Sequence, residues 1–186
     1  MSPSSTTPVL TEREGPPWLY PYRQDAQLGW HGELVLRPLL PVSLVNGAMR
    51  TPRLAGLVAS GADLTLVSGL LAEQLGIDLK DYEGEGDHLA AGGVVRARYK
   101  TIDLRLHAPD AAETGCREWR SKIGFVENCW PSNGLVVLGN VGFFDQFEVA
   151  ISAFAHSVAI ESPDPHRDAS PEPEPEPERP SPVLAT

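Results

Sequence analysis

The sequence is poor in cysteine, with only Cys116 and Cys129 among its 186 residues. The two do not form a Cys-x-x-Cys motif, and the five histidines include no pair at the spacing of metal ligands. We therefore expect neither a disulfide framework nor a zinc site, and we predict no bound metal. A reducing compartment would keep both cysteines as thiols.

Basic residues are also scarce, because 15 Lys and Arg residues stand against 25 Asp and Glu residues, which gives a net charge of −10. Residues 161–186 hold seven acidic residues and two arginines, so −5 of that charge lies there and −5 is left for the rest of the chain. No basic surface is predicted on composition. Nucleic acid is therefore not an expected partner.

Long apolar runs are missing as well. No segment approaches the length that spans a membrane, and the first residues lack the basic start and apolar run of a signal peptide. We therefore expect a cytoplasmic protein with no membrane partner. The Gly-x-Ser-x-Gly motif of serine hydrolases is absent too, and neither cysteine has a recognisable histidine partner, so no nucleophilic enzyme class is indicated.

What the chain does contain is apolar material, 41% of its residues, for one domain, which we place at residues 33–160. Residues 1–16 predict a disordered leader. Residues 161–186, with their Pro-Glu repeat, predict a disordered acidic tail, interpreted as a spacer, with partner docking as the alternative. Residues 17–32 combine prolines with aromatics and predict an extended strap on its own domain; the alternative is a segment that occupies a binding cleft.

Short apolar or alternating runs, separated by turn residues, predict a mostly β, barrel-like domain. The strongest hairpin signal is Asn46-Gly47, because both residues tolerate the positive φ of a tight turn. A second hairpin is predicted with its tip at Gly92-Gly93, after an acidic loop over residues 81–88. Two short helices are predicted, one over residues 69–75 and one that begins near Asn140.

Two stretches stand out within this pattern. From Leu57 to Ser68 the sequence reads Leu-Val-Ala-Ser-Gly-Ala-Asp-Leu-Thr-Leu-Val-Ser, which predicts strand, sharp turn and strand, with the turn at Ser60-Gly61-Ala62 buried. Later, Leu135-Val136-Val137-Leu138-Gly139 is typical of a short, fully buried strand.

Taken in order, these motifs resemble the retropepsin-like aspartic proteases, and bacterial members most closely, over residues 33–160. The family's active-site loop has two apolar residues, then Asp, Ser or Thr, Gly, and Ala or Ser. Leu57-Val58 and Ser60-Gly61-Ala62 match it, but Ala59 stands where the family has its catalytic Asp. The Gly92-Gly93 hairpin matches the family's flap, and Val136 to Asn140 its second apolar-glycine motif. The resemblance implies a closed β-barrel with two short helices, which works as a homodimer without a cofactor.

In such proteases each subunit brings one Asp to a shared site, where the pair holds one proton and activates a water against a peptide bond. The resemblance implies that Ser60 ties the two loops together and that Gly61 lets the substrate approach. It also implies that Asp63 helps to hold the loop, and that the peptide or protein substrate is contacted by Ala62, Asp63, Gly92, Gly93 and Val94. We interpret Asp63 as a structural carboxylate and not as a substitute for the missing acid.

A methyl group at position 59 cannot deprotonate water, so the chain as written is predicted to lack peptidase activity. We favour an engineered replacement in an active endopeptidase, because the rest of the loop motif is intact. The alternatives are a natural pseudoprotease and a non-catalytic module that adds a peptide as an extra strand under the hairpin. A structural domain without a cleft is a third alternative, and it predicts a monomer.

Overall fold

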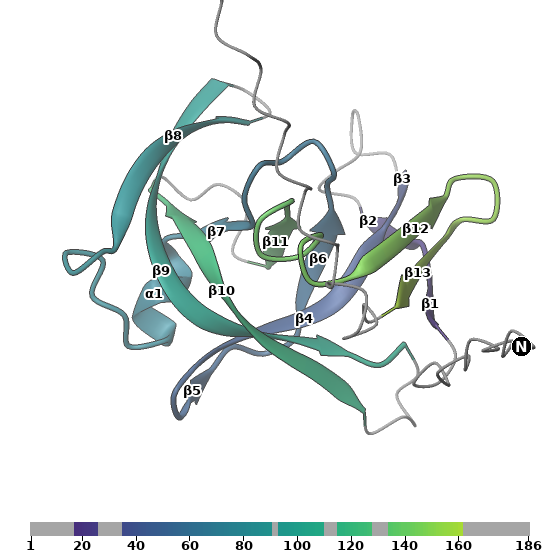
Figure 1. The fold of residues 1–186 in the computed structure, drawn as a ribbon, viewed down its shortest axis with the longest axis horizontal. Helices are drawn as coiled ribbons and strands as arrows, with labels where there is room; N and C mark the ends of the chain where they lie inside the picture. The colour runs from purple at the N-terminus through teal and green to yellow at the C-terminus, as the bar shows by residue number, and fades with distance from the viewer. Residues whose placement is uncertain (1–16, 26–34, 91–92, 110–114, 128–133, 162–186) are drawn as a thin grey trace, which may run out of the picture.

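A computed structural model describes residues 17–25, 35–90, 93–109, 115–127 and 134–161. The predicted leader, the tail after Glu161, residues 26–34 and Gly92 lie outside the described residues. The elements follow in chain order (Figure 1): β1 (Trp18–Pro21), β2 (Arg23–Asp25), β3 (Val35–Arg37), β4 (Leu39–Asn46), β5 (Met49–Arg50), β6 (Leu54–Val58), β7 (Leu66–Ser68), α1 (Leu70–Gln74), β8 (Gly84–Ala90), β9 (Gly93–His107), β10 (Cys116–Val126), β11 (Leu135–Leu138), β12 (Glu148–Ser152) and β13 (Ser157–Glu161).

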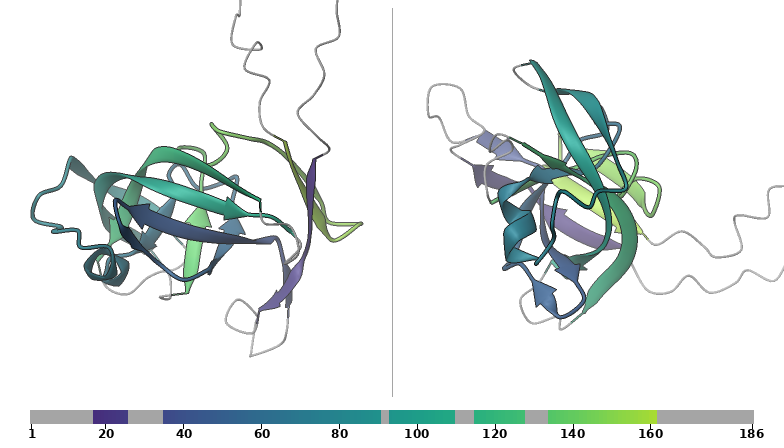
Figure 2. Two further views of the ribbon diagram at one scale, coloured as in Figure 1. Left: turned by 90° about the horizontal axis from the view of Figure 1, so that it is seen from below. Right: turned by 90° about the vertical axis from the view of Figure 1, so that its left-hand side faces the viewer.

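Six strands close into a mixed β-barrel in the order β4-β6-β11-β7-β10-β9, which confirms the predicted closed, mostly β fold. The barrel closes because β4 pairs with β6 through Leu39–Val42 and with β9 through Val42–Val45. Strand β11 is parallel to β6, and β10 is parallel to β7, while the other pairs in the ring are antiparallel. Strands β5 and β8 extend the sheet beyond the ring (Figure 2).

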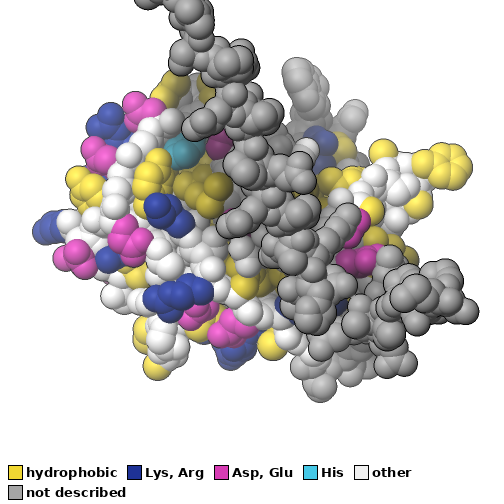
Figure 3. All heavy atoms as spheres, in the orientation of Figure 1, with side chains coloured by type: hydrophobic (Ala, Val, Ile, Leu, Met, Phe, Trp, Pro, Cys, Tyr) yellow, Lys and Arg dark blue, Asp and Glu magenta, His cyan; other side chains and the backbone are white. Residues whose placement is uncertain are grey.

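The barrel is filled by side chains that alternate along its strands. On β9, Ile102, Leu104 and Leu106 are buried, as their spacing predicts, while the residues between them are partly exposed. On β10 and β9 the outward side chains pair by charge, with Arg105 contacting Glu118 at 2.6 Å. Basic and acidic side chains accordingly lie interspersed on the face drawn in Figure 3.

A second, three-stranded sheet stands beside the barrel in the order β1-β13-β12 (Figures 1 and 2). Strand β1 pairs with β13 from Trp18 to Pro21, so these residues of the expected strap belong to a sheet of their own domain. Tyr20 is buried, and its hydroxyl donates to the backbone carbonyl of His107 at 2.8 Å. This bond fastens the second sheet to the end of β9.

The predicted Asn46-Gly47 hairpin is confirmed. Gly47 has a φ of 58° in the turn between β4 and β5, where Asn46 pairs with Met49. Helix α1 is five residues long and is followed by Gly76 with a φ of 63°, the left-handed residue that ends many helices. Among the described residues, no helix is both long and apolar enough to cross a membrane.

The acidic segment 81–88 was expected to be a loop, but its second half forms strand β8, so that expectation is wrong. The carboxylate of Glu83 fixes the start of the strand, because it accepts from the backbone N–H of Thr101 at 3.0 Å and from the Thr101 hydroxyl at 2.6 Å. The ring of Tyr99 lies against Gly84 and Gly86, in space that a larger residue would need. Glycine therefore serves here to admit an aromatic neighbour.

The second expected helix, near Asn140, is also wrong, and α1 is the one helix among the described residues. Backbone N–H groups of residues 144, 145 and 146 reach back five, five and three residues, to Gly139, Asn140 and Phe143. An α-helix needs a span of four. Gly142, with a φ of 100°, interrupts the right-handed conformation and turns the segment into a series of turns.

Candidate functional site

The candidate site is built on β11, which lies between β6 and β7. Although β6 and β7 are neighbours in the sequence, they do not pair with each other. Residues 135–138 pair in parallel with residues 55–58, and Val136 and Val137 pair antiparallel with Val67 and Leu66. The turn that joins β6 to β7 must therefore cross over the end of β11.

Backbone hydrogen bonds lock this turn onto the residues that follow β11. The turn closes on itself where Ala62 N–H donates to the Ala59 carbonyl at 3.0 Å. Four further bonds join it to residues 138–141: Ala59 N–H to Leu138 O at 3.0 Å, Asn140 N–H to Ala62 O at 2.8 Å, Val141 N–H to Asp63 O at 2.9 Å, and Thr65 N–H to Val141 O at 2.8 Å. Main-chain bonds thus hold the turn at five points.

Thr65 adds a side-chain bond that the sequence interpretation missed. It is fully buried, and its hydroxyl oxygen accepts from the backbone N–H of Gly139 at 3.1 Å. A Cβ on Gly139 would clash with the backbone carbonyl of Leu64, so only glycine lets the two segments come so close. The sequence feature that could have indicated this bond is a single threonine between Leu64 and Leu66, in an otherwise apolar stretch.

The turn is partly open to solvent. Ala59 and Ala62 are half-buried, whereas Ser60, Gly61 and Asp63 are exposed, so the expectation of a buried turn is wrong for the single chain. A Cβ built on Gly61 would meet nothing within 4 Å. The carboxylate of Asp63 makes no bond to a described residue, and Asp63 holds the turn through its backbone carbonyl.

A second hydrophobic cluster joins the turn to the hairpin made by β8 and β9. Its buried members come from the turn, from the hairpin and from β7, β10 and β11 between them: Leu64, Leu66, Ala97, Val126 and Val137. Ala59 and Ala62 of the turn pack against this cluster, and so do Val95 and Tyr99 of the hairpin. The two segments that the family resemblance places at the substrate therefore share one apolar surface.

Beyond that cluster the hairpin is open to solvent. Leu89 and Val94 pair across the two strands, and they are 88% and 70% exposed. Gly93 has a φ of 138°, which an L-residue with a side chain rarely adopts, while Gly92 lies outside the described residues. The described part of the tip thus presents two unpacked apolar side chains.

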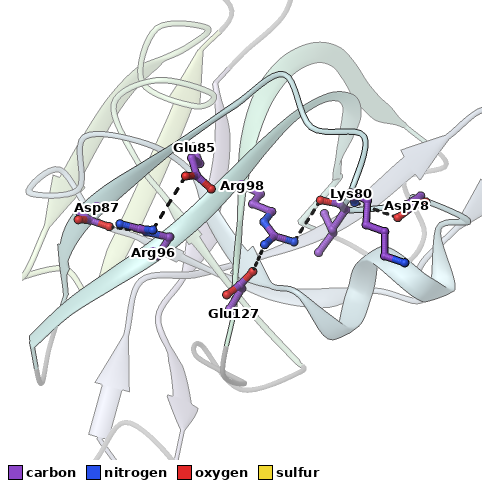
Figure 4. A network of polar contacts seen from close by, with 8 residues as sticks. Asp78, Lys80, Glu85, Asp87, Arg96, Arg98 and Glu127 are labelled. Carbon is purple, nitrogen blue, oxygen red and sulfur yellow. Dashed lines mark hydrogen bonds and ion pairs between the residues drawn. The ribbon is translucent and has the colours of Figure 1, made fainter.

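Charged contacts hold the two strands of the hairpin together on the side away from its tip (Figure 4). Arg96 contacts Asp87 at 3.0 Å and Glu85 at 3.9 Å, across the two strands. The hydrogen bond and the charge of Arg96 lower the pKa of Asp87. Arg98 contacts Glu127 at 2.8 Å and donates to the backbone carbonyl of Leu79, so it joins the hairpin to the end of β10 and to the loop after α1.

Tyr99 and His88 form a further polar pair on the hairpin. The Tyr99 hydroxyl lies 3.0 Å from His88 Nε2. Burial, followed by the nearby charges of Asp87 and Glu85, raises the pKa of Tyr99, so its hydroxyl stays neutral at physiological pH. This pair stiffens the strand that carries Val95 into the shared apolar cluster.

The turn offers binding surface more than acid–base chemistry. Of residues 59–65 only Asp63 ionises, and position 59 carries a methyl group. Within the described ranges, no group of three or more His, Cys, Asp or Glu side chains could hold a metal ion. In comparisons with known proteins, no protein-family model matches the chain, and no curated protein matches its sequence.

Proposed function

We propose that the chain is one half of a retropepsin-like aspartic endopeptidase, which acts as a homodimer when position 59 carries Asp. One observation carries the proposal. The turn from Ala59 to Asp63 is locked by its backbone to residues 138–141, while Ser60 and Gly61 remain exposed beside the β8–β9 hairpin. A rigid, outward-facing turn is what a half-site needs if a second copy is to complete it.

The proposed chemistry follows from symmetry. Two copies of the turn would bring two carboxylates from position 59 within a few ångströms, and such a pair resists double ionisation. The ionised member takes a proton from a water, while the protonated member polarises the carbonyl of the scissile bond. Because both copies change together, one substitution removes both carboxylates, and the chain as written is proposed to bind peptide without cleaving it.

The test is to restore the acid with Ala59→Asp and to compare it with the isosteric Ala59→Asn. Both purified variants and the parent chain would be incubated with an unfolded protein from mildly acidic to neutral pH, and fragments followed by mass spectrometry. We expect cleavage by Ala59→Asp alone, with a bell-shaped pH profile that reports the coupled pair. A folded, dimeric Ala59→Asp variant that cleaves nothing would overturn the proposal.

A peptide-binding module is the second candidate, and the methyl group of Ala59 is the observation that favours it. In that case a peptide pairs as an added strand near the hairpin, and no acid is required. Saturable peptide binding without turnover, in the Ala59→Asp variant as well as the parent, would support this function over the protease.

A further inference from the structure

A cavity of about 370 Å³ lies at the start of β6, whereas the Ala59 turn follows the end of that strand. Its apolar lining includes Leu39, Pro41 and Ala55. Two arginines, Arg23 and Arg53, also line it. The volume falls in the range of sites that accept small ligands or short peptide segments. We refer to it as the Arg23–Arg53 cavity.

The cavity carries positive charge that no described carboxylate contacts. No acidic residue is among the described residues that line it, and neither arginine forms an ion pair with a described residue. By contrast with the two cavity arginines, Arg96, Arg98 and Arg105 of β9 each contact a carboxylate. In a chain of net charge −10, two guanidinium groups at one cavity without a described carboxylate partner indicate a binding site for an acidic ligand.

The neighbouring His107 is also affected by the positive charge of Arg53, one of the two cavity arginines. Burial, followed by the positive charges of Arg53, Arg105 and Arg50, lowers the pKa of His107. His107 directly precedes Ala108, which lines the cavity. Burial first, and then the nearby arginines, therefore disfavour the protonated form of His107 at this end of the barrel.

The arginines and the apolar walls together favour a ligand that carries both carboxylates and rigid hydrocarbon. Guanidinium groups bind carboxylates through paired hydrogen bonds, and the apolar walls suit flat, rigid hydrocarbon such as a prolyl ring. Residues 171–178 of this chain read Pro-Glu four times and contain no basic residue. In an extended polyproline conformation, residues two apart would be spaced by roughly 6 Å along the chain axis.

The segment can reach the cavity. Pro171 follows Glu161 by ten residues, which span roughly 33 Å when extended. From Glu161 the path to Arg23 runs back along β13 to Ser157, across to its partner Pro21, and two residues on, a total of roughly 25 Å. The tether is thus long enough without strain.

We propose that the Arg23–Arg53 cavity binds the chain's own Pro-Glu segment, residues 171–178. The contact ties the acidic C-terminal region to the barrel at a position away from the Ala59 turn. It is independent of the proposed protease activity, because none of its residues belongs to that turn or to the hairpin.

The test uses the full chain and a fluorescein-labelled peptide with the sequence of residues 171–178, followed by fluorescence anisotropy at low and high salt. In a tail-neutralised chain, Glu172, Glu174, Glu176 and Glu178 are replaced by Gln. We expect this chain to bind the peptide at least about tenfold more tightly than the parent, because the tethered segment competes at high effective concentration. High salt weakens the binding.

In the tail-neutralised chain, Arg23→Gln with Arg53→Gln should weaken peptide binding by about tenfold or more, and Arg53→Gln alone by less. The matched control, Arg96→Gln with Arg120→Gln, removes the same charge from exposed arginines elsewhere and should leave binding unchanged. Circular dichroism checks that each variant folds, and Arg53→Gln alone serves if the double variant does not.

Two outcomes would overturn the proposal. Equal binding by the parent and the tail-neutralised chain would mean that the tethered segment does not occupy the cavity. Binding that is absent, or that survives loss of Arg53 unchanged, would mean that the cavity is not its site.

Discussion

At the scale of single residues, Thr65 shows how much of the turn depends on one hydroxyl. It is the buried side chain that links the strand after the turn to Gly139, and its oxygen accepts a hydrogen bond that no water can replace at this depth. The turn therefore has both a main-chain and a side-chain connection to the end of β11.

Thr65→Val is expected to lower the free energy of unfolding by about 1–3 kcal/mol, because it leaves the N–H of Gly139 buried without a partner. Urea denaturation followed by fluorescence measures the change. Thr65→Ser keeps the hydroxyl and should lose much less. A valine variant as stable as the parent would show that the hydrogen bond of Thr65 does not stabilise the fold.

Gly61→Ala separates folding from function. A Cβ at Gly61 meets nothing within 4 Å, so the melting temperature should not change. In the Ala59→Asp background, however, the added methyl would stand where the substrate is proposed to lie, and we expect cleavage to fall at least about tenfold. Gly134→Ala, which is equally unobstructed, is the control and should keep full activity.

His107 makes stability depend on pH. Its Nε2 lies 2.9 Å from the Ser43 hydroxyl, and burial together with the nearby arginines lowers its pKa below the ordinary value of 6.5. Below that pH the unfolded chain takes up a proton that the folded chain refuses, so the free energy of unfolding falls as the pH drops toward the folded pKa. Above about pH 6.5 this contribution is constant.

Urea denaturation across the mildly acidic range should therefore show a shallower pH dependence for His107→Gln than for the parent. His156→Asn is the control, at an exposed position whose positive φ asparagine also tolerates. If the His107→Gln slope matches the parent slope, the histidine is not the group that titrates.

At the scale of elements, the turns after β11 illustrate how a glycine can overrule a helical pattern. The phenylalanines at 143, 144 and 147 have helical spacing, but the segment instead packs through tertiary contacts. Trp119 donates from its ring N–H to the carbonyl of Gly142 at 2.8 Å, and its ring meets Phe147 edge-on at 4.8 Å.

Gly142→Ala should destabilise the fold by about 1–3 kcal/mol, since alanine strains a φ of 100° and its Cβ would lie 2.8 Å from the Thr65 hydroxyl oxygen. Gly76→Ala is the comparison, because Gly76 also has a positive φ but faces only one side-chain atom, at 4.0 Å. Thermal melts should rank Gly142→Ala as the more harmful. The reverse order would rule out crowding against Thr65.

The elements that the sequence predicted well are those whose signal is local. Strand β11 was predicted to within one residue, over residues 135–139, because a short apolar run between turns has few other uses, and the Asn46-Gly47 hairpin needs only two residues. Strand β8 was missed because an edge strand takes its order from β9 and from Glu83, and not from its own apolar content.

At the scale of the whole molecule, the closed barrel was expected from the family resemblance, but the strand pairing that closes it could not be predicted from the local pattern. Closure depends on β4 changing partners at Val42, from β6 to β9, and nothing in the local pattern marks that residue. The Arg23–Arg53 cavity was likewise invisible, because its lining comes from segments far apart in the chain. The position of the turn was predictable from its motif, whereas its exposure was set by contacts with residues 138–141.

The proposed function requires two copies. We expect sedimentation equilibrium to give about twice the chain mass of 20.1 kDa, with or without the acid at position 59. Ser60→Arg should shift the protein toward monomer, because it places charge at the proposed axis, whereas Ala48→Arg, on the exposed hairpin after β4, should not. A parent chain that is monomeric at every concentration tested would contradict the half-site.

The position of β11 also bears on how the molecule is made. Strands β6 and β7 have been synthesised by Ser68, yet the strand that separates them begins at Leu135, after about 70 further residues of translation. Until then, the nascent chain holds two apolar strands apart with no partner between them, and late non-local pairing is slow. The turn is therefore completed only after β11 has been synthesised, so a chain truncated before Leu135 would leave it unformed.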